Sequence, residues 1–447
     1  MKIFSYRYLP LNIYVGYSIF VLVSLFVGPM KYKDLDYLVL TSFIVLLVFL
    51  FWLGYVAGAR GDYRQFSNHF EARSVSYQRI GWFLSTLLVL GVISSVGQWY
   101  SFLISGGGLK FSDIGDSYVN GYAGYERGQA KIDLFYILNI FDQALAALIL
   151  LFSFYYFRVM GAPARYAFLF VVTTYLLINV VGTGKQKHLG DVVIFTFYCM
   201  VLNFATKGRK LKIRTLGAAT VAALFVFFMF VEILRQRYSA AGIGLDNIYE
   251  KTHPLISWDE GSLVFSLVSS EYALALGIFL GYFTNGLYGL YLSLTLPFEW
   301  TCFLGNSYSL GRIVEIALSA DGSILEHTYP YRVGVTYGWG FDKWHSLFAW
   351  LASDITFFGV LFLAPLFSFL YARLWLQAIK ACNPFAGPLF IYLSLGLIFS
   401  YANNQIMHGL AGVIVLVVLL VGWVLSRNLS YQDLFDRDDL NRRKETR

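Results

Sequence analysis

Long apolar runs, separated by short polar segments, recur along the whole chain. A membrane-spanning helix needs about 20 consecutive apolar residues, and ten runs are close to that length. The pattern predicts an all-α polytopic membrane protein with about ten transmembrane helices. The predicted spans are residues 12–30, 37–57, 82–104, 134–157, 166–183, 189–205, 215–234, 353–376, 386–403 and 409–426.

The spans divide the chain into four parts. Residues 1–234 hold seven predicted helices, and residues 353–426 hold three. Between them, the connector 235–352 is too long and too rich in mixed residue types to be a simple linker. Ordered loops of such length are usually functional. A charged tail, 427–447, closes the chain.

Composition supports this assignment. Hydrophobic residues make up 57% of the chain and charged residues 14%, whereas soluble proteins carry roughly a quarter charged residues. A soluble globular enzyme and a disordered chain are therefore excluded. The net charge of +7 does not indicate nucleic acid, because the basic residues concentrate at helix ends and in short loops. The three cysteines share no aqueous compartment and have no metal-ligand spacing, so neither a disulfide nor a metal site is expected.

Charge also predicts orientation. The N-terminus, the connectors 58–81, 158–165, 206–214 and 377–385, and the tail are rich in Lys and Arg. The connectors on the opposite side are net acidic. Because basic loops stay in the cytoplasm, both termini are expected inside and the connector 235–352 outside.

Residues 262–298 are apolar enough to supply another span. One extra crossing would place the basic tail outside, which contradicts the charge pattern. The stretch contains helix-breaking residues: Gly277, Gly281, Asn285, Gly286, Gly289 and Pro297. We expect a re-entrant hairpin of two short helices lining a cavity, since irregular backbone at membrane depth needs cover from protein or water. A helix pair lying on the bundle is the alternative.

The connector carries most of the candidate chemistry. Its charged and titratable residues are Arg235, Arg237, Arg312, Arg332, Asp259, Glu260, Glu271, Glu299, Glu315, Glu326, Asp342, His253, His327 and His345. Aromatic residues, including Tyr331 and Trp339, are dense in it. Such rings can stack on sugars, but they are equally typical of a bilayer interface.

Two further outer loops carry cations. The turn 182–188 is glycine-rich, opens a helix and contains Lys185 and Lys187. Backbone N–H groups and lysines there suit a diphosphate. The turn lacks the Lys-Ser/Thr pair of a nucleotide-binding loop, and a plain interfacial turn is the alternative. In the loop 106–133, Arg127 is the best candidate for ligand contact.

Three acids lie at or near membrane depth: Asp142, Glu232 and Asp354. Ionisable residues there are costly and usually functional. We expect them around one outward cavity, with Arg235 and Lys185 as cationic partners. Charge pairs that only fix helix packing are the alternative.

Several motifs in these regions resemble the Wzy-type O-antigen and oligosaccharide repeat unit polymerases. They are the turn Gly182–Lys187, the run Gly286-Leu-Tyr-Gly-Leu-Tyr-Leu-Ser-Leu before Pro297-Phe-Glu-Trp, Gly305-Asn-Ser, and Trp344-His-Ser-Leu-Phe-Ala-Trp-Leu-Ala-Ser-Asp354. The resemblance implies a GT-C-like glycosyltransferase of the bacterial inner membrane. Such an enzyme joins undecaprenyl-diphosphate-linked repeat units into a surface polysaccharide such as lipopolysaccharide O-antigen, at the periplasmic face. It implies no cofactor, no metal and no nucleic acid, and as partners a chain-length regulator and a flippase.

This resemblance suggests roles for named residues. Leaving-group stabilisation falls to Arg312 and Arg332, since arginine binds phosphate bidentately. Glu299 is the favoured base, with Asp354 and His345 behind it. The remaining substrate-binding candidates are Lys185, Lys187, Arg127, Arg235, Asp142, Trp339 and Tyr331. The rival functions are an O-antigen ligase, a transporter or flippase of a lipid-linked sugar, and a non-enzymatic scaffold.

Overall fold

The computed structural model describes residues 6–60, 73–74, 77–104, 109, 114–119, 134–207, 213–320, 322–341, 343–380, 383–426 and 429–430. Within them, eight helices are long and apolar enough to cross a membrane. The chain forms two compact units. Unit 1 comprises Met1–Arg60, Gly242–Arg373 and Leu393–Val413, and unit 2 comprises Gly61–Ala241, Leu374–Tyr392 and Ile414–Arg447.

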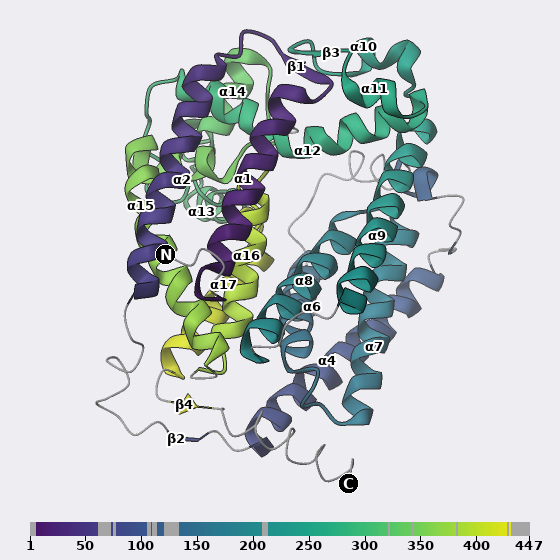
Figure 1. Cartoon of the computed structure of the whole chain (residues 1–447), viewed down its shortest axis with the longest axis vertical. Coiled ribbons are helices and arrows are strands. Elements are labelled where there is room, and N and C mark those ends of the chain that lie inside the picture. Colours follow the sequence, from purple (N-terminus) through teal and green to yellow (C-terminus); the bar gives the residue numbers. More distant parts are fainter. Residues whose placement is uncertain are drawn as a thin grey trace. The chain divides into compact units, whose positions relative to one another are not determined.

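The predicted all-α membrane fold is confirmed, because nearly all described elements are helices (Figure 1). The helices that overlap the predicted spans are α1 (Leu9–Val27), α2 (Tyr37–Arg60), α4 (Tyr77–Ile104), α6 (Leu134–Tyr156), α7 (Ala162–Leu176) continued by the π-helical turn η3 (Leu177–Gly182), α8 (Lys187–Lys207), α9 (Ile213–Ala240), α15 (Leu347–Ile379), α16 (Ala386–Phe399) and α17 (Leu410–Leu425). The count of ten crossings stays a prediction, since α9, α16 and α17 are not among the eight candidate spans, whereas the connector helix Ser270–Leu294 is.

Small residues let the helices of unit 1 approach closely. A Cβ atom on Gly54 would lie 2.0 Å from the Pro365 carbonyl oxygen, and one on Gly58 would lie 2.6 Å from the Phe369 oxygen. The two glycines are one turn apart on α2, so they form the small-xxx-small pattern that packs membrane helices backbone to backbone. These glycines therefore allow α2 to pack closely against α15.

The connector folds into short elements around one long helix. These are η4 (Leu245–Asn247), α10 (Ile248–Lys251), β3 (Ile256–Trp258), α11 (Leu263–Leu267), α12 (Ser270–Leu294), α13 (Tyr308–Leu318), η5 (Leu325–His327) and α14 (Tyr329–Tyr337). The strand β3 pairs antiparallel with β1 (Met30–Tyr32), which follows α1. A second pair, β2 (Arg73–Ser74) with β4 (Leu429–Ser430), is parallel.

The expected re-entrant hairpin at 262–298 is wrong. Residues 270–294 form one continuous helix, α12, which runs crosswise to α1 and α2 in Figure 1. The glycines that suggested breaks are points of close approach instead. A Cβ on Gly286 would lie 2.2 Å from the Ala402 oxygen, and one on Gly289 would lie 2.9 Å from the Trp344 oxygen.

Connectors predicted for the same side of the membrane meet within unit 1. The β1–β3 pair joins the first connector to the long one. Asn404, after α16, donates from its side-chain nitrogen to the Asn306 side-chain oxygen at 2.9 Å. These contacts agree with the predicted alternation of sides, while the orientation in the membrane stays a prediction.

In unit 2, the turn 182–188 joins η3 to α8 and packs against α4 and α9, through Phe102 beside Gly182 and through the bond from Gln186 to the Phe230 oxygen. Ile114, Val180, Val181 and Ile233 form a buried cluster beneath this turn. Gly184 has φ +67°, and a Cβ there would lie 2.7 Å from the Ile114 oxygen. The turn therefore requires glycine at this position.

Candidate functional site

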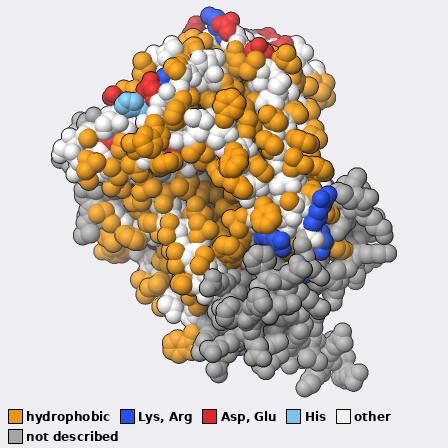
Figure 2. Space-filling view, turned by 90° about the vertical axis from the view of Figure 1, so that its left-hand side faces the viewer, with side chains coloured by type: hydrophobic (Ala, Val, Ile, Leu, Met, Phe, Trp, Pro, Cys, Tyr) orange, Lys and Arg blue, Asp and Glu red, His pale blue; other side chains and the backbone are white. Residues whose placement is uncertain are grey.

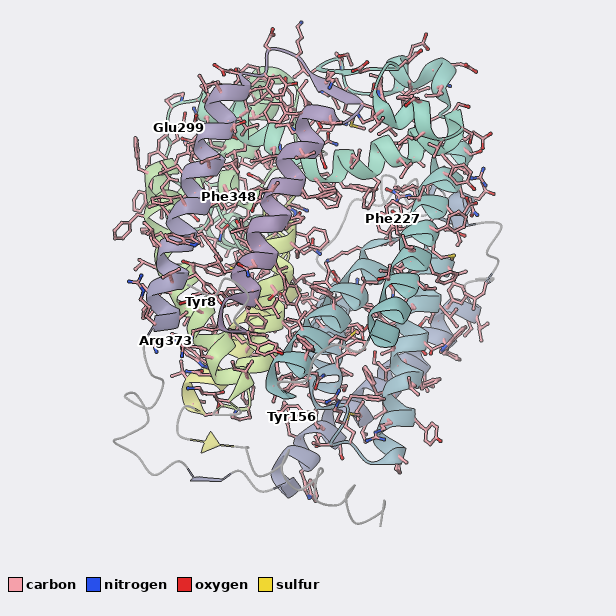
Figure 3. The ribbon with its side chains drawn as sticks, viewed as in Figure 1. Tyr8, Tyr156, Phe227, Glu299, Phe348 and Arg373 are labelled. Carbon is pink, nitrogen blue, oxygen red and sulfur yellow. The ribbon has the colours of Figure 1, made fainter. Side chains whose placement is uncertain are left out.

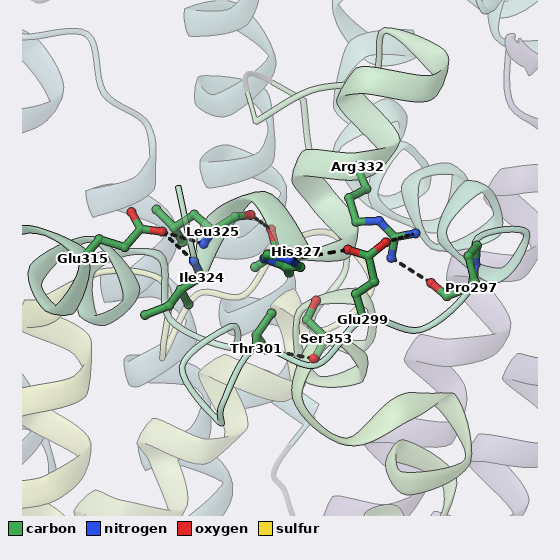
Figure 4. A network of polar contacts seen from close by, with 10 residues as sticks. Pro297, Glu299, Thr301, Glu315, Ile324, Leu325, His327, Arg332 and Ser353 are labelled. Carbon is green, nitrogen blue, oxygen red and sulfur yellow. Dashed lines mark hydrogen bonds and ion pairs between the residues drawn. The ribbon is translucent and has the colours of Figure 1, made fainter. Parts of the chain in front are cut away.

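A polar network in unit 1 contains two of the predicted catalytic residues (Figure 4). The Arg332 Nη2 atom lies 2.9 Å from Glu299 Oε1. The Arg332 Nη1 group donates to the Pro297 carbonyl oxygen at 2.7 Å. The other carboxylate oxygen of Glu299 lies 3.9 Å from His327 Nε2. The structure thus joins Glu299, Arg332 and His327 from the loop after α12, from α14 and from η5.

Local sequence explains how α14 presents Arg332. Thr328 caps the helix, because its side chain accepts the Tyr331 N–H. Pro330 occupies the first turn, where its missing N–H is tolerated. Arg332 then falls in that turn, and its guanidinium lies 5.9 Å from the centre of the Tyr329 ring.

The three side chains differ in exposure. Arg332 is 14% exposed and held by two acceptors, while Glu299 is 42% exposed. His327 is also exposed. Figure 3 shows Glu299 at the opposite end of unit 1 from Arg373 of α15. The network is a fixed cation beside an accessible carboxylate and imidazole, at one end of the helices.

Asp354 has a structural role that the expectation of a base did not include. Its Oδ1 accepts the Thr301 hydroxyl at 2.5 Å and the Gly305 N–H at 2.8 Å, and its Oδ2 accepts the Asn306 N–H at 2.8 Å. The carboxylate is buried. Both oxygens are therefore occupied in holding the loop 301–306 against α15.

This loop also has an unusual backbone. Cys302 and Phe303 have φ of +55° and +62°, a region that residues other than glycine rarely adopt. The three hydrogen bonds to Asp354 hold the loop in this conformation. Asp354 therefore positions the segment between Glu299 and α13.

Arg312 lies on α13 and pairs with Glu315 at 3.3 Å. Glu315 is 1% exposed, and its Oε1 also accepts the N–H groups of Ile324 and Leu325 at 2.9 and 2.7 Å. The buried carboxylate thus connects α13 to η5, the element that carries His327. Arg312 is half exposed and remains a candidate for anion contact.

Two further predicted site residues, His345 and Trp339, are buried like Asp354. The His345 Nε2 atom lies 3.0 Å from the Gly340 oxygen, and Trp339 donates from Nε1 to the Trp344 oxygen at 3.3 Å. Both pack under α12 and have no exposed surface for a ligand. The base role expected for His345 and the sugar-stacking role expected for Trp339 therefore do not fit the structure.

Tyr331 remains partly exposed beside the network. Its hydroxyl donates to Glu326 Oε1 at 3.3 Å. The nearby Glu326 carboxylate raises the pKa of the Tyr331 phenol above its ordinary value. The Tyr331 phenol is therefore neutral over an even wider range of pH than an ordinary tyrosine.

The lysine turn belongs to unit 2. Lys185 and Lys187 are exposed, while Gln186 between them is buried. The Gln186 side chain donates to the Phe230 oxygen of α9 at 2.9 Å. This anchor turns both lysines outward, which is compatible with the predicted anion contact.

The membrane acids have separate local partners. In unit 2, Asp142 accepts hydrogen bonds from Ser94 and, at 2.8 Å, from Gln98. Glu232 pairs with Arg235 through two N–O contacts of 2.9 and 2.7 Å. Arg235 is thus the partner of Glu232, as expected, and the pair lies within α9, so it does not join two helices. The expected common cavity would join these two acids of unit 2 to Asp354 of unit 1, and it stays a prediction. Arg127 lies outside the described residues.

His327 is the network member that the sequence did not single out. It was one histidine among three in the connector, and no spacing linked it to Glu299. Among the described residues, no group of three or more His, Cys, Asp or Glu could hold a metal ion.

Comparison with protein-family models, with curated protein sequences and with solved structures finds no match to this chain.

Proposed function

We propose that this chain is a membrane glycosyltransferase that joins undecaprenyl-diphosphate-linked oligosaccharide repeat units into a surface polysaccharide, such as O-antigen. The reaction would take place at the periplasmic face of the bacterial inner membrane, and both termini would lie in the cytoplasm. The observation that carries the proposal is the Arg332–Glu299–His327 network in the long connector. The sequence motifs around it, from Gly286 to Asp354, support the same reading.

Arg332 is assigned to the leaving group. When the acceptor hydroxyl attacks the anomeric carbon of the donor glycan, the bond from that carbon to the diphosphate oxygen breaks. Negative charge then develops on the diphosphate, which fixed cations stabilise. Arg332 suits this role because Glu299 and the Pro297 oxygen already hold its guanidinium in place. Arg312 is the second candidate.

The proton of the acceptor hydroxyl needs a base within hydrogen-bond reach. Glu299 is accessible and its Oε2 faces His327, so we assign proton uptake to this pair. Asp354 and His345 are poorer candidates, because both are buried and already bonded to backbone groups.

Further substrate contacts are proposed for the exposed cations and the ring of Tyr331. Lys185 and Lys187 suit a diphosphate or an acidic sugar, with Arg127, Arg235 and Asp142 as additional candidates. Tyr331 suits a sugar face. A chain-length regulator and a flippase are the proposed partners.

Deletion of the gene in its source bacterium tests the proposal. If the chain is a polymerase, deletion should remove the ladder of surface glycans, while single repeat units still reach the carrier or core. Loss of every surface repeat unit would favour a ligase or a flippase. An unchanged ladder would exclude this function.

Complementation then tests the network. Arg332→Ala should abolish polymer without loss of protein, and Arg332→Lys should restore little, because lysine cannot bind bidentately. Lys251→Ala, an exposed residue of the same connector, is the matched control and should complement fully. Normal polymer from well-expressed Arg332→Ala and Arg312→Ala variants would contradict the assignment of these arginines to the leaving group.

A further inference from the structure

The helix α13 has its polarity reversed relative to a helix in water. Its acid, Glu315, is 1% exposed, and its one basic residue, Arg312, pairs with Glu315 and is 43% exposed. Its apolar residues face outward: Ile316 is 48% exposed and Leu318 is 69% exposed, and Ile313 and Ala317 are also exposed. A helix on a water-facing surface buries its apolar stripe and exposes its charges. The outer face of α13 is therefore built for an apolar surrounding.

The segment 298–303 shows the same reversal. Phe298, Trp300 and Phe303 are exposed, the last two at 55% and 68%. Between them, Glu299 turns to Arg332, and Thr301 turns inward to Asp354. The Trp300 and Phe303 rings pack edge to face at 5.5 Å. Thr301 thus points into the protein and the aromatic rings point out, while Glu299 lies against Arg332 with 42% of its side chain exposed.

This apolar face continues onto a candidate membrane helix. The Thr301 hydroxyl donates to the Ser353 oxygen at 2.8 Å, which fixes the segment beside the first turns of α15. Exposed rings follow on that helix at Phe358 and Phe362. Figure 2, which views the side on which α2 and α15 lie, shows apolar side chains over most of the described surface, charged ones at its upper edge and further Lys and Arg side chains lower on the right.

We propose that the outer face of α13 and the rings of the segment 298–303 lie in the interfacial layer of the lipid bilayer. The occupant is lipid, because the face is apolar, carries aromatic rings suited to the interface, and joins a helix long and apolar enough to span. An amphipathic helix in this layer buries its apolar face at the boundary of head groups and acyl chains. The inference does not rest on the proposed function.

This placement has a consequence for the polar network. Glu299 lies between Phe298 and Trp300 in the chain, so it sits at the level of the head groups. The connector is then fastened to the membrane beside Arg332 and His327, and an amphiphile with an anionic head could reach them from the bilayer plane.

The test uses the full-length protein in vesicles of phosphatidylethanolamine and phosphatidylglycerol. A nitroxide spin label is attached to Cys302, which is exposed, in a Cys199→Ala, Cys382→Ser background. In a separate variant, the label is placed at Leu318→Cys in place of Cys302. Power saturation then compares the accessibility of each label to oxygen, which partitions into lipid, and to a nickel chelate, which stays in water.

Phe358→Cys on α15 is the lipid-facing control, and Lys251→Cys is the water-facing control. Labels at 302 and 318 should favour oxygen over the nickel chelate, as the label at 358 does. Preference for the nickel chelate, as at 251, would overturn the proposal. Shielding from both reagents would overturn it too, and would indicate a protein partner or a second copy.

If the cysteine-substituted background fails to fold, photo-crosslinking in the otherwise native chain gives the same decision. A benzophenone amino acid replaces Leu318, with Phe358 and Lys251 as the controls. Lipid adducts at 318 and 358, but not at 251, are expected. Cross-linked dimers or absence of lipid adducts at 318 would contradict the proposal.

Discussion

The guanidinium of Arg332 lies 2.9 Å from the carboxylate of Glu299, which joins the first turn of α14 to the loop that follows α12. The same guanidinium donates to the Pro297 oxygen, so it bonds to both ends of a three-residue stretch. Arg332 is mostly covered while Glu299 stays accessible. The pair therefore combines a fixed positive charge with an open carboxylate.

Glu299→Gln should leave the fold intact and lower the rate of polymerisation. The amide keeps the shape of the side chain and a contact for Arg332, but it cannot take up a proton. Loss of a general base typically costs about 10²–10⁴-fold in rate. The measurement is polymer formation from purified lipid-linked repeat units, with His327→Asn as the companion variant. Wild-type rates in both variants would remove the base assignment from this pair.

Asp354→Ala should unfold the loop 301–306 rather than produce a folded, inactive protein. The substitution leaves the Gly305 and Asn306 N–H groups without their acceptor. Each hydrogen bond to a charged group contributes about 1.5–3 kcal/mol, so we expect a loss of roughly 3–5 kcal/mol. The unfolding midpoint in detergent reports this loss. Asp354→Asn, which keeps one acceptor oxygen, should lie between Ala and wild type. A fully stable but inactive Asp354→Ala protein would restore the catalytic role.

Gly286→Ala on α12 should destabilise unit 1. The added methyl group would lie 2.2 Å from the Ala402 oxygen and 2.3 Å from the Tyr401 oxygen. Both are backbone atoms of the turn after α16, so α12 and this turn must move apart, at a cost of about 1–3 kcal/mol. Gly16→Ala on α1 is the matched control, since its Cβ meets nothing within 4 Å. The control should be neutral or stabilising by up to about 1 kcal/mol. Equal thermal stability of the two variants would contradict the close approach.

Thr356→Gly should stabilise the protein relative to Thr356→Ala. Thr356 has φ +67° and ψ +166° inside α15, a region essentially restricted to glycine that costs about 1–3 kcal/mol for other residues. Both substitutions remove the Thr356 hydroxyl that accepts the Gly359 N–H at 3.2 Å, so their difference isolates the backbone. Thermal unfolding of the two variants side by side gives this difference. A more stable alanine variant would show that α15 does not hold this conformation.

The sequence alone was sufficient to predict the class of fold. Lipid cannot hydrogen-bond the backbone, so spanning segments must be helical and apolar for about 20 residues. Such apolar runs can be recognised directly in the sequence. Every predicted span overlaps a helix in the structure. The stretch 262–298, which lies outside the predicted spans, shows what the pattern could not decide. The same glycines are consistent with a broken hairpin and with a continuous helix packed closely on the backbone at 401–402.

The candidate site was predictable only in part. Glu299, Arg312 and Arg332 were among the charged residues of the connector, and the family resemblance suggested their roles. Their partners depended on the tertiary structure, since Glu299 meets Arg332 and His327 only after the loop, η5 and α14 have packed together. Burial decided the rest. Asp354, His345 and Trp339 carry the right chemistry, but the fold uses them inside, bonded to backbone groups, where a substrate cannot reach them.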